Sequence, residues 1–143
     1  MNTRGIIGQL ARIREAANLL IERELKARCI EGIVPAHGPV LAFLFQQNKP
    51  VPIKAIVESI GRVKSTVTVM INTLEKYGYI KKSSCETDNR VVNIELTHRG
   101  REIQKDFDEI SNTLVDKVYG DMKKKHREEL VKQLNQIEQN MRE

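Results

Sequence analysis

The stretch KSTVTVMINTLEKYG, residues 64–78, decides the fold of this chain. Its apolar residues recur at the spacing of one helical face, at Val67, Met70, Ile71 and Leu74. The opposite face carries short polar side chains and a lysine but few carboxylates, a chemistry suited to a phosphate backbone and to base edges. Gly78 follows at once and favours the left-handed conformation that ends a helix. The stretch therefore predicts an amphipathic helix with a polar, cationic outer face.

A second, shorter apolar pattern precedes this helix. It places four residues on one helical side, namely Ile53, Ile56, Val57 and Ile60. The segment Gly61-Arg62-Val63 separates the two patterns, and helices joined by a short turn with glycine are typical of a helix-turn-helix. Further upstream, Pro35 fits the first turn of another helix, and Val51 fits a strand of one or two residues.

The hydrophobic period changes after residue 78. Residues 79–82 have the pattern of a short strand, and residues 92–96 alternate apolar and polar side chains as a half-buried strand does. Residues 83–90 between them are polar and rich in turn formers. A helix-turn-helix followed by a hairpin with a polar tip predicts a winged helix.

Long amphipathic helices are predicted on both sides of the winged helix. One covers residues 4–28, and Gly32 is expected to end it. A second covers residues 97–119, with Thr97 as its N-cap. A third closes the sequence, with apolar positions that repeat over residues 130–141.

These outer helices carry more apolar surface than one winged helix needs. We expect them to pair two chains, because two-fold dimers are the commonest oligomers and two reading heads suit DNA. The alternative is that they fold back on their own chain. The predicted fold is mainly α with a small β-wing. A winged helix-turn-helix DNA-binding region occupies residues 35–100, and N- and C-terminal dimerisation helices occupy residues 1–34 and 101–143 of a single chain.

Composition and charge limit the function classes. The 143 residues fit one domain with extra helices, and the net charge of +5 permits a polyanionic partner. The charge is +3 in residues 1–52, +3 in residues 53–100 and −1 in residues 101–143, so the winged-helix segment shares the basic excess. We find no apolar run of about 18 residues, no secretory pattern and no disulfide framework. We therefore expect a cytoplasmic, reduced protein with no membrane partner.

Four segments, taken in order, carry a family resemblance. They are KSTVT at 64–68, LEKYGYI at 74–80, DNR at 88–90 and LTHRG at 96–100. In this combination the chain resembles the MarR family (multiple-antibiotic-resistance regulators) over nearly its whole length. The resemblance implies a homodimeric transcription regulator, usually a repressor. It implies a helix from each subunit in the major groove of a near-palindromic operator, with the wing in the minor groove. It also implies that a small effector, often an aromatic acid, or cysteine oxidation releases the DNA.

The candidate DNA-binding residues are on the outer face of the 64–77 helix and in the wing. They are Lys64, Ser65, Thr66, Thr68, Val69, Asn72, Lys82, Asp88 and Arg90. Arg90 is the strongest candidate because a guanidinium fits the narrow, negative minor groove, and Asp88 resembles the family partner that orients it. The alternative is a solvated helix face and, for Lys82, a solvated strand edge.

The sequence departs from the family pattern at two positions. Val69 stands where relatives often have arginine, and its methyl groups suit contact with a thymine methyl. Val63 stands where a capping Asp or Ser is frequent. We expect Ser65 or a bound phosphate to serve the start of that helix instead.

Sites outside the DNA surface are less specific. Cys29 and Cys85 are the only thiols. Oxidation of an exposed Cys85 in the wing would disturb DNA contact, but an incidental cysteine is favoured because only two lysines lie near it in sequence. The resemblance makes His37 a candidate for the effector pocket. It also allows a zinc site through Cys29, Glu31 and His37, but the chain lacks metal-ligand spacing, so we expect neither a metal nor another cofactor.

Two other classes of function were weighed. A winged helix that binds another protein would leave the Asp88-x-Arg90 motif and the carboxylate-poor helix face unexplained. An enzyme is not expected, because the sequence has no glycine-rich phosphate loop, no paired carboxylate site and no nucleophile–base pair.

Overall fold

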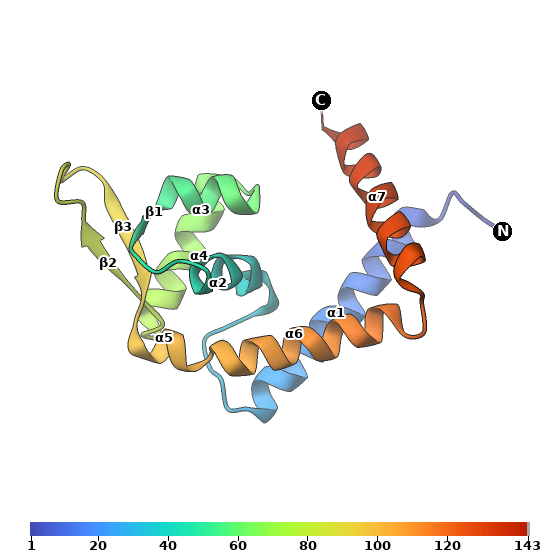
Figure 1. The fold of residues 1–143 in the computed structure, drawn as a ribbon, viewed down its shortest axis with the longest axis horizontal. Helices are drawn as coiled ribbons and strands as arrows, with labels where there is room; N and C mark the ends of the chain where they lie inside the picture. The colour runs from blue at the N-terminus through green and yellow to red at the C-terminus, as the bar shows by residue number, and fades with distance from the viewer. Residues whose placement is uncertain (143) are drawn as a thin grey trace. The chain divides into compact units, whose positions relative to one another are not determined.

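The computed structural model describes residues 1–142. The chain divides into two compact units, one ending at Ile110 and the other beginning at Ser111. The first unit holds a winged helix-turn-helix with a small antiparallel sheet, and the second holds the end of one helix and all of another (Figure 1). The predicted fold class is confirmed. Among the helices of residues 1–142, none is long and apolar enough to cross a membrane.

Helices α3 (Ile53–Ile60) and α4 (Lys64–Lys76) form the helix-turn-helix, and both predictions are confirmed. Gly61 follows α3 at φ 67°, a left-handed conformation that glycine adopts without steric cost. The helix predicted near Pro35 begins with the 3-10 turn η1 (Pro35–His37) and continues as α2 (Gly38–Phe45). The helical part of the winged helix therefore consists of η1, α2, α3 and α4.

The wing is a three-stranded antiparallel sheet in the order β1-β3-β2. Its strands are β1 (Val51–Pro52), β2 (Ile80–Ser84) and β3 (Val92–Leu96). Strand β2 extends two residues beyond the predicted segment, because Ser83 and Ser84 continue the ladder opposite β3. The expected alternation holds at Ile94 and Leu96, which are buried, but Val92 near the tip is exposed.

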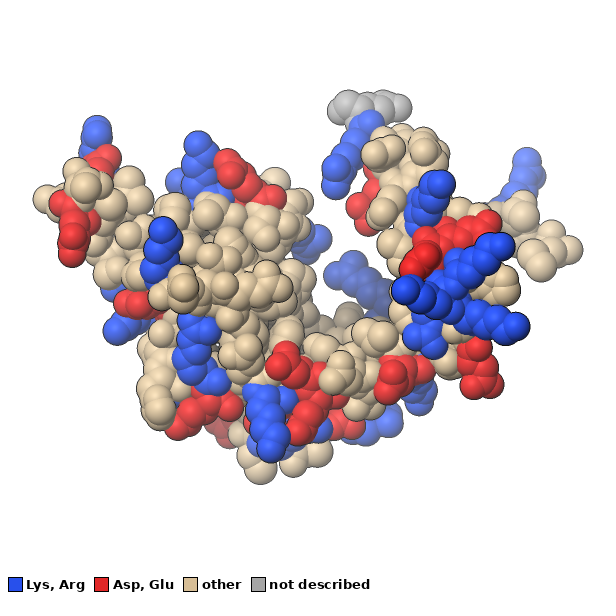
Figure 2. Space-filling view, in the orientation of Figure 1, with Lys and Arg blue, Asp and Glu red and all other residues tan. Residues whose placement is uncertain are grey.

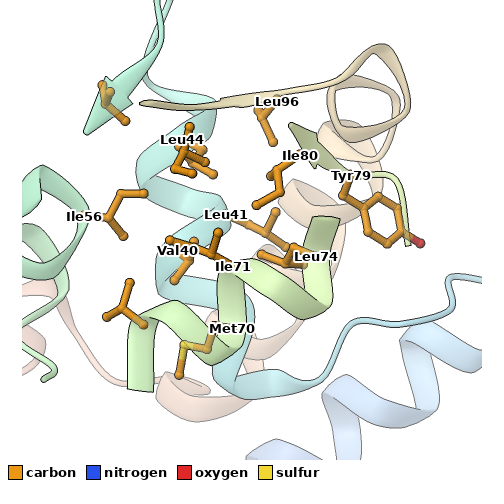
Figure 3. Close-up of a cluster of buried hydrophobic side chains, with 13 residues drawn as sticks. Val40, Leu41, Leu44, Ile56, Met70, Ile71, Leu74, Tyr79, Ile80 and Leu96 are labelled. Atoms are coloured by element: carbon orange, nitrogen blue, oxygen red, sulfur yellow. The ribbon is translucent and has the colours of Figure 1, made fainter. Parts of the chain in front are cut away.

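One hydrophobic core joins the helix-turn-helix to the sheet. Figure 3 shows side chains from α2, α3, α4 and the strands converging in it. The predicted inner face of α4 is fully placed there, with Val67, Met70, Ile71 and Leu74 buried. Burial of a large aliphatic side chain is worth about 1.5–3 kcal/mol. The outer face of α4 is therefore fixed in direction by the packing of its inner face.

The segment between α1 and η1 is fastened to the end of α4. The hydroxyl of Tyr79 donates a hydrogen bond of 2.6 Å to the carbonyl of Glu31. Gly32 lies against the Tyr77 ring at φ 83°, and a Cβ at this position would overlap the ring. Gly32 is thus required by close packing.

Helix α1 (Ile6–Ala27) agrees with the predicted range 4–28 to within two residues, but Gly32 is not the residue that ends it. Cys29 adopts the left-handed conformation at φ 57°. Its N–H donates to the carbonyl of Lys26 (3.1 Å), and the N–H of Ile30 donates to the carbonyl of Leu25 (3.0 Å). This pair of bonds is a Schellman motif, so the terminal carbonyls are satisfied without a glycine.

The apolar stripe of α1 is largely uncovered within the chain. Leu25 is its only buried residue. The large exposed apolar side chains of this helix are Ile6, Ile7, Ile13 and Leu19. At the C-terminal end of α1, Arg28 pairs with Asp106 (3.0 Å) and Glu109 (2.5 Å) of the segment that begins α6. Hydrogen bonds to Glu109 and then Asp106 raise the pKa of Arg28 above its usual value.

The helix predicted over residues 97–119 is interrupted. Thr97 caps it as expected, accepting a hydrogen bond from the Gly100 N–H (3.1 Å), and this prediction is confirmed. However, α5 (His98–Glu102) stops at Ile103, and α6 (Gln104–Tyr119) begins after it. Ile103 packs against the core, as does Phe107, whose ring meets Phe45 edge-on at 5.1 Å.

The second unit contains the end of α6 and helix α7 (Lys124–Met141). Gly120, at φ 53°, ends α6 as predicted. The guanidinium of Arg127 stacks on the Tyr119 ring at 4.9 Å and donates from Nε to the carbonyl of Met122 (2.7 Å). No residue of α7 is buried.

Candidate nucleic-acid interface

Helix α4 presents a polar stripe on the side opposite its core face. The stripe recurs at helical spacing and consists of Ser65, Val69, Asn72 and Lys76, all exposed. Lys64 at the helix start is also exposed, whereas Thr66 and Thr68 are half-buried at its margins. Val69 is 65% exposed, so its methyl groups project into solvent. The structure therefore places most of the predicted recognition residues together on one surface.

The N-terminus of α4 has no side-chain cap. Val63 precedes the helix in extended conformation, and neither it nor Ser65 supplies a capping hydrogen bond. The first helical hydrogen bond runs from the Val67 N–H to the Val63 carbonyl at 3.1 Å. The N–H groups of residues 64–66 therefore precede the helical hydrogen-bond ladder, at the end where the helix dipole attracts anions.

The tip of the wing orients Arg90 through Asp88. The Asp88 carboxylate accepts a hydrogen bond from the Arg90 backbone N–H (3.0 Å) and pairs with the Arg90 Nε (3.2 Å). The hydrogen bond from the guanidinium lowers the pKa of Asp88, and the backbone bond adds to this effect. The Arg90 side chain itself is 91% exposed. Its guanidinium is thus paired with Asp88 on one side and open to solvent on the other.

A groove of about 450 Å³ connects α3, the start of α4 and the wing. Three cations line it, Lys54, Lys64 and Arg90, beside apolar side chains such as Ile53 and Val92. Lys54 was not predicted as a site residue. The signal that could have found it is its place on the exposed side of α3, two residues after Pro52.

Lys82 turns from the wing toward the recognition helix. Its Nζ donates to Asn72 Oδ1 at 2.6 Å and pairs with Glu75 at 3.4 Å. Its neighbour Lys81 pairs instead with Glu95 across the sheet at 3.6 Å. Two adjacent lysines that look equivalent in the sequence therefore have different partners.

Charge on the visible face of the molecule is mixed. In Figure 2, basic and acidic side chains intermingle over much of that face, and large uncharged areas separate them. The described residues of this face therefore form no continuous basic patch, and the cations that line the groove beside α4 are Lys54, Lys64 and Arg90.

Comparison with known proteins identifies the domain. Residues 40–92 match the MarR family model. This segment contains α3, α4 and most of the wing. The resemblance to the MarR family is confirmed for this segment.

The chain is similar to a curated relative, the HTH-type transcriptional regulator SarZ of Staphylococcus epidermidis. The two are 29% identical over 77 residues. The match covers 54% of this chain and 52% of SarZ, so the chain spans about half the length of this relative in the match.

Solved structures share the fold over nearly the whole chain. The S. aureus MepR–DNA complex superposes with a TM-score of 0.81 at 17% identity, covering 99% of both chains. Bordetella bronchiseptica BpsR, solved to explain regulation of its DNA binding by 6-hydroxynicotinic acid, superposes with a TM-score of 0.75 at 16% identity. That match covers 92% of this chain and 91% of BpsR. At these identities the likeness shows a common fold.

The two thiols lie in different settings. Cys29 is exposed at the end of α1. Cys85, expected to be exposed, is half-buried, because its Sγ packs 3.2 Å from Thr87 Oγ1. Hydrogen bonding from Thr87 lowers the pKa of the Cys85 thiol, a contribution that sequence proximity to lysines did not reveal. A redox role for either cysteine stays a prediction.

His37 is buried at the junction of η1 and α2. Its Nδ1 accepts a hydrogen bond from the Val34 N–H (3.1 Å), and burial lowers its pKa. The structure does not join it to Cys29 and Glu31, since residues 1–142 contain no group of three or more His, Cys, Asp or Glu placed to hold a metal ion.

A second cavity of about 450 Å³ lies beside His37, between α1 and the helix-turn-helix. Its walls are Asn18, Val34, Pro35, Ala36, Pro39, Ile60 and Met70, with Arg14 and Arg62 as its two cations. His37 is not one of the lining residues, although its neighbours are. The arginines were missed because they are far apart in sequence, one on α1 and one in the turn before α4. An effector role for His37 stays a prediction.

Proposed function

We propose that this MarR-family chain is a DNA-binding transcriptional regulator that acts as a homodimer on a near-palindromic operator. Helix α4 would enter the major groove, and Arg90 at the wing would reach the flanking minor groove. The observation that carries the proposal is the arrangement around α4. An exposed polar stripe, an uncapped helix start and three groove-lining cations face the same region.

Contacts to the DNA phosphate backbone would explain the groups on this surface that do not read bases. The free N–H groups at the start of α4 and the side chains of Lys54 and Lys64 suit phosphate oxygens. The MepR structure is a complex with DNA, and its fold matches this chain throughout. This likeness supports the same class of partner for the present chain.

The dimer follows from the uncovered apolar faces. Ile7 of α1 is 66% exposed and Val118 of α6 is 52% exposed. Monomeric proteins rarely leave such a row of large apolar side chains in water. A second copy of the chain would cover it and would supply the second reading head for a symmetric operator. Repression, rather than activation, is the usual mode in the family and is part of the proposal.

A salt series tests DNA binding directly. Affinity for duplex DNA should fall steeply as salt rises, because each phosphate contact releases counterions. A protein-interaction module, the competing class, would show no comparable affinity for duplex DNA. Footprinting of the purified protein should reveal two protected half-sites about one helical turn apart. A single protected half-site would contradict the dimer while leaving DNA binding intact.

We also propose that the cavity holding Arg14 and Arg62 receives the effector. A small anion with an apolar, aromatic body would fit its mixed walls, with the carboxylate on the guanidiniums. The cavity joins α1 to the turn before α4, so an occupant would bias the direction of the recognition helix. BpsR, whose DNA binding is regulated by 6-hydroxynicotinic acid, supports this class of ligand.

The effector proposal is tested by titrating the protein with 6-hydroxynicotinate in the presence and absence of DNA. Binding should weaken at least tenfold in Arg62→Met, because a buried carboxylate would lose its charged partner. Arg12→Met is the matched control, since Arg12 is exposed on α1 and is not a lining residue of the cavity. Equal binding by both variants would remove the cavity from the proposal.

A further inference from the structure

Lys82 and Asn72 form a contact that joins the wing to the outer face of the recognition helix. The distance of 2.6 Å between Lys82 Nζ and Asn72 Oδ1 is that of a strong, charge-assisted hydrogen bond. Glu75, one turn further along α4, holds the same ammonium at 3.4 Å. The Lys82 side chain lies between these partners and is 33% exposed.

The contact fixes which way the Asn72 amide points. An ammonium has three donors and no acceptor, so the amide atom that faces it must be the carbonyl oxygen. The amide nitrogen must then point away from Lys82. Asn72 is exposed on the same stripe as Ser65 and Val69, so its NH₂ group remains available to a partner.

This orientation limits what Asn72 is able to read on DNA. An unrestrained asparagine pairs with adenine by accepting from N6 and donating to N7. Here the second lone pair of Oδ1 lies beside a cation, which repels the positive hydrogen of an approaching donor. The two N–H donors are unaffected, and guanine offers two major-groove acceptors, N7 and O6.

We propose that Lys82, held by Glu75, makes Asn72 a donor-only reader that selects guanine over adenine at one position of each half-site. The proposal deepens the proposed function and rests on it. Lys82 is a positioning residue in this scheme, acting through Asn72. It differs from the simpler role of a phosphate contact, which would affect all DNA sequences equally.

The test is selection of bound duplexes from a randomised pool, followed by affinity measurements on the selected site and on its single-base variants. Wild-type protein should prefer guanine over adenine about tenfold at one symmetric position. Lys82→Met keeps the aliphatic stem but removes the donor, and it should shift preference at that position toward adenine. Lys82→Arg should restore guanine preference. Asn72→Ala should lose discrimination at that position and keep it elsewhere.

Lys81→Met is the matched control. It removes the same charge from the same strand, but Lys81 pairs with Glu95 and does not touch Asn72. It should leave the base preference unchanged. If Lys82→Met lowers affinity for every sequence alike, with no change of preferred base, the proposal is overturned and Lys82 is a phosphate contact. If the wild-type protein binds no duplex at any salt concentration, the proposed function fails as well.

Discussion

Helices α1 and α4 are built on the same amphipathic plan but have opposite fates in the chain. The inner face of α4 is completed by its own domain, with four apolar residues buried. The apolar face of α1 is not, and Leu25 alone is buried over 22 residues. The exposed side of α4 is polar and short-chained, whereas the exposed side of α1 retains Ile7, Ile13 and Leu19.

The difference shows that an apolar stripe predicts which face of a helix is buried, but it does not identify the residues that bury it. For α4 the cover is α2, α3 and the sheet (Figure 3). For α1 we propose a second chain. The remaining polar face of α4 then needs another explanation, and the proposed partner there is DNA. The exposed face of each helix thus indicates one proposed partner, a second chain for α1 and DNA for α4.

The largest expected effect comes from the same truncation on each helix. Ile71→Ala removes a side chain that is fully buried in the core, and it should lower the free energy of unfolding by about 2–5 kcal/mol. Ile13→Ala removes one that is 51% exposed. Its effect should be within about 0.5 kcal/mol at dilutions where chains separate. Urea unfolding at several protein concentrations measures both.

The concentration dependence decides the outcome of this comparison. The loss in Ile13→Ala should grow with protein concentration, because dimer stability depends on it, while the loss in Ile71→Ala should not. A loss in Ile13→Ala that stays small at every concentration would break the comparison. The α1 stripe would then have no partner in a second copy.

A smaller effect is expected from replacing one of two arginines, Arg90 in the wing or Arg12 on α1. Arg90→Ala should weaken operator binding at least tenfold, because the oriented guanidinium would be lost from the minor groove. The thermal midpoint should barely change, since the Arg90 side chain is 91% exposed. Arg12→Ala, on the exposed side of α1, serves as the control and should bind within twofold of wild type. Similar losses in both variants would point to general charge rather than to the wing.

The sequence predicted α3, α4 and the wing closely because each is decided by local signals. The apolar period of α4 and the glycine after it determine a helix and its end without reference to distant residues. The Asp88–Arg90 pair was expected from the family resemblance, and the structure shows it at 3.2 Å. Long-range features were beyond this kind of reasoning.

Three features were not predicted. The break at Ile103 has no counterpart in the apolar period, which continues through Ile103 and Phe107. The contact between Lys82 and Asn72 joins a strand to a helix face, and the sequence analysis treated these two residues as separate DNA contacts. The left-handed position of Cys29 was missed because glycine is the usual residue there, and Gly32 stood nearby.

The smallest expected effect concerns the C-terminal ends of α1 and α4. Both α1 and α4 end in a Schellman motif, with Cys29 in the left-handed position of one and Gly78 in that of the other. A side chain in this conformation costs about 1 kcal/mol relative to glycine. Cys29→Gly should therefore raise the free energy of unfolding by up to about 1 kcal/mol, and Gly78→Ala should lower it by a similar amount. Urea unfolding under reducing conditions measures the pair.

Steric crowding is not the cause at Gly78, because an added Cβ would lie 3.8 Å from its nearest neighbour, the Arg99 side chain. The predicted loss there is thus purely conformational. Cys29→Ala separates the thiol from the backbone effect, and it should leave stability nearly unchanged because alanine shares the same strain. If Cys29→Gly and Cys29→Ala both stabilise the protein equally, the cysteine side chain, rather than its backbone conformation, is the source of the cost. The two helix ends would then differ in chemistry and not in strain.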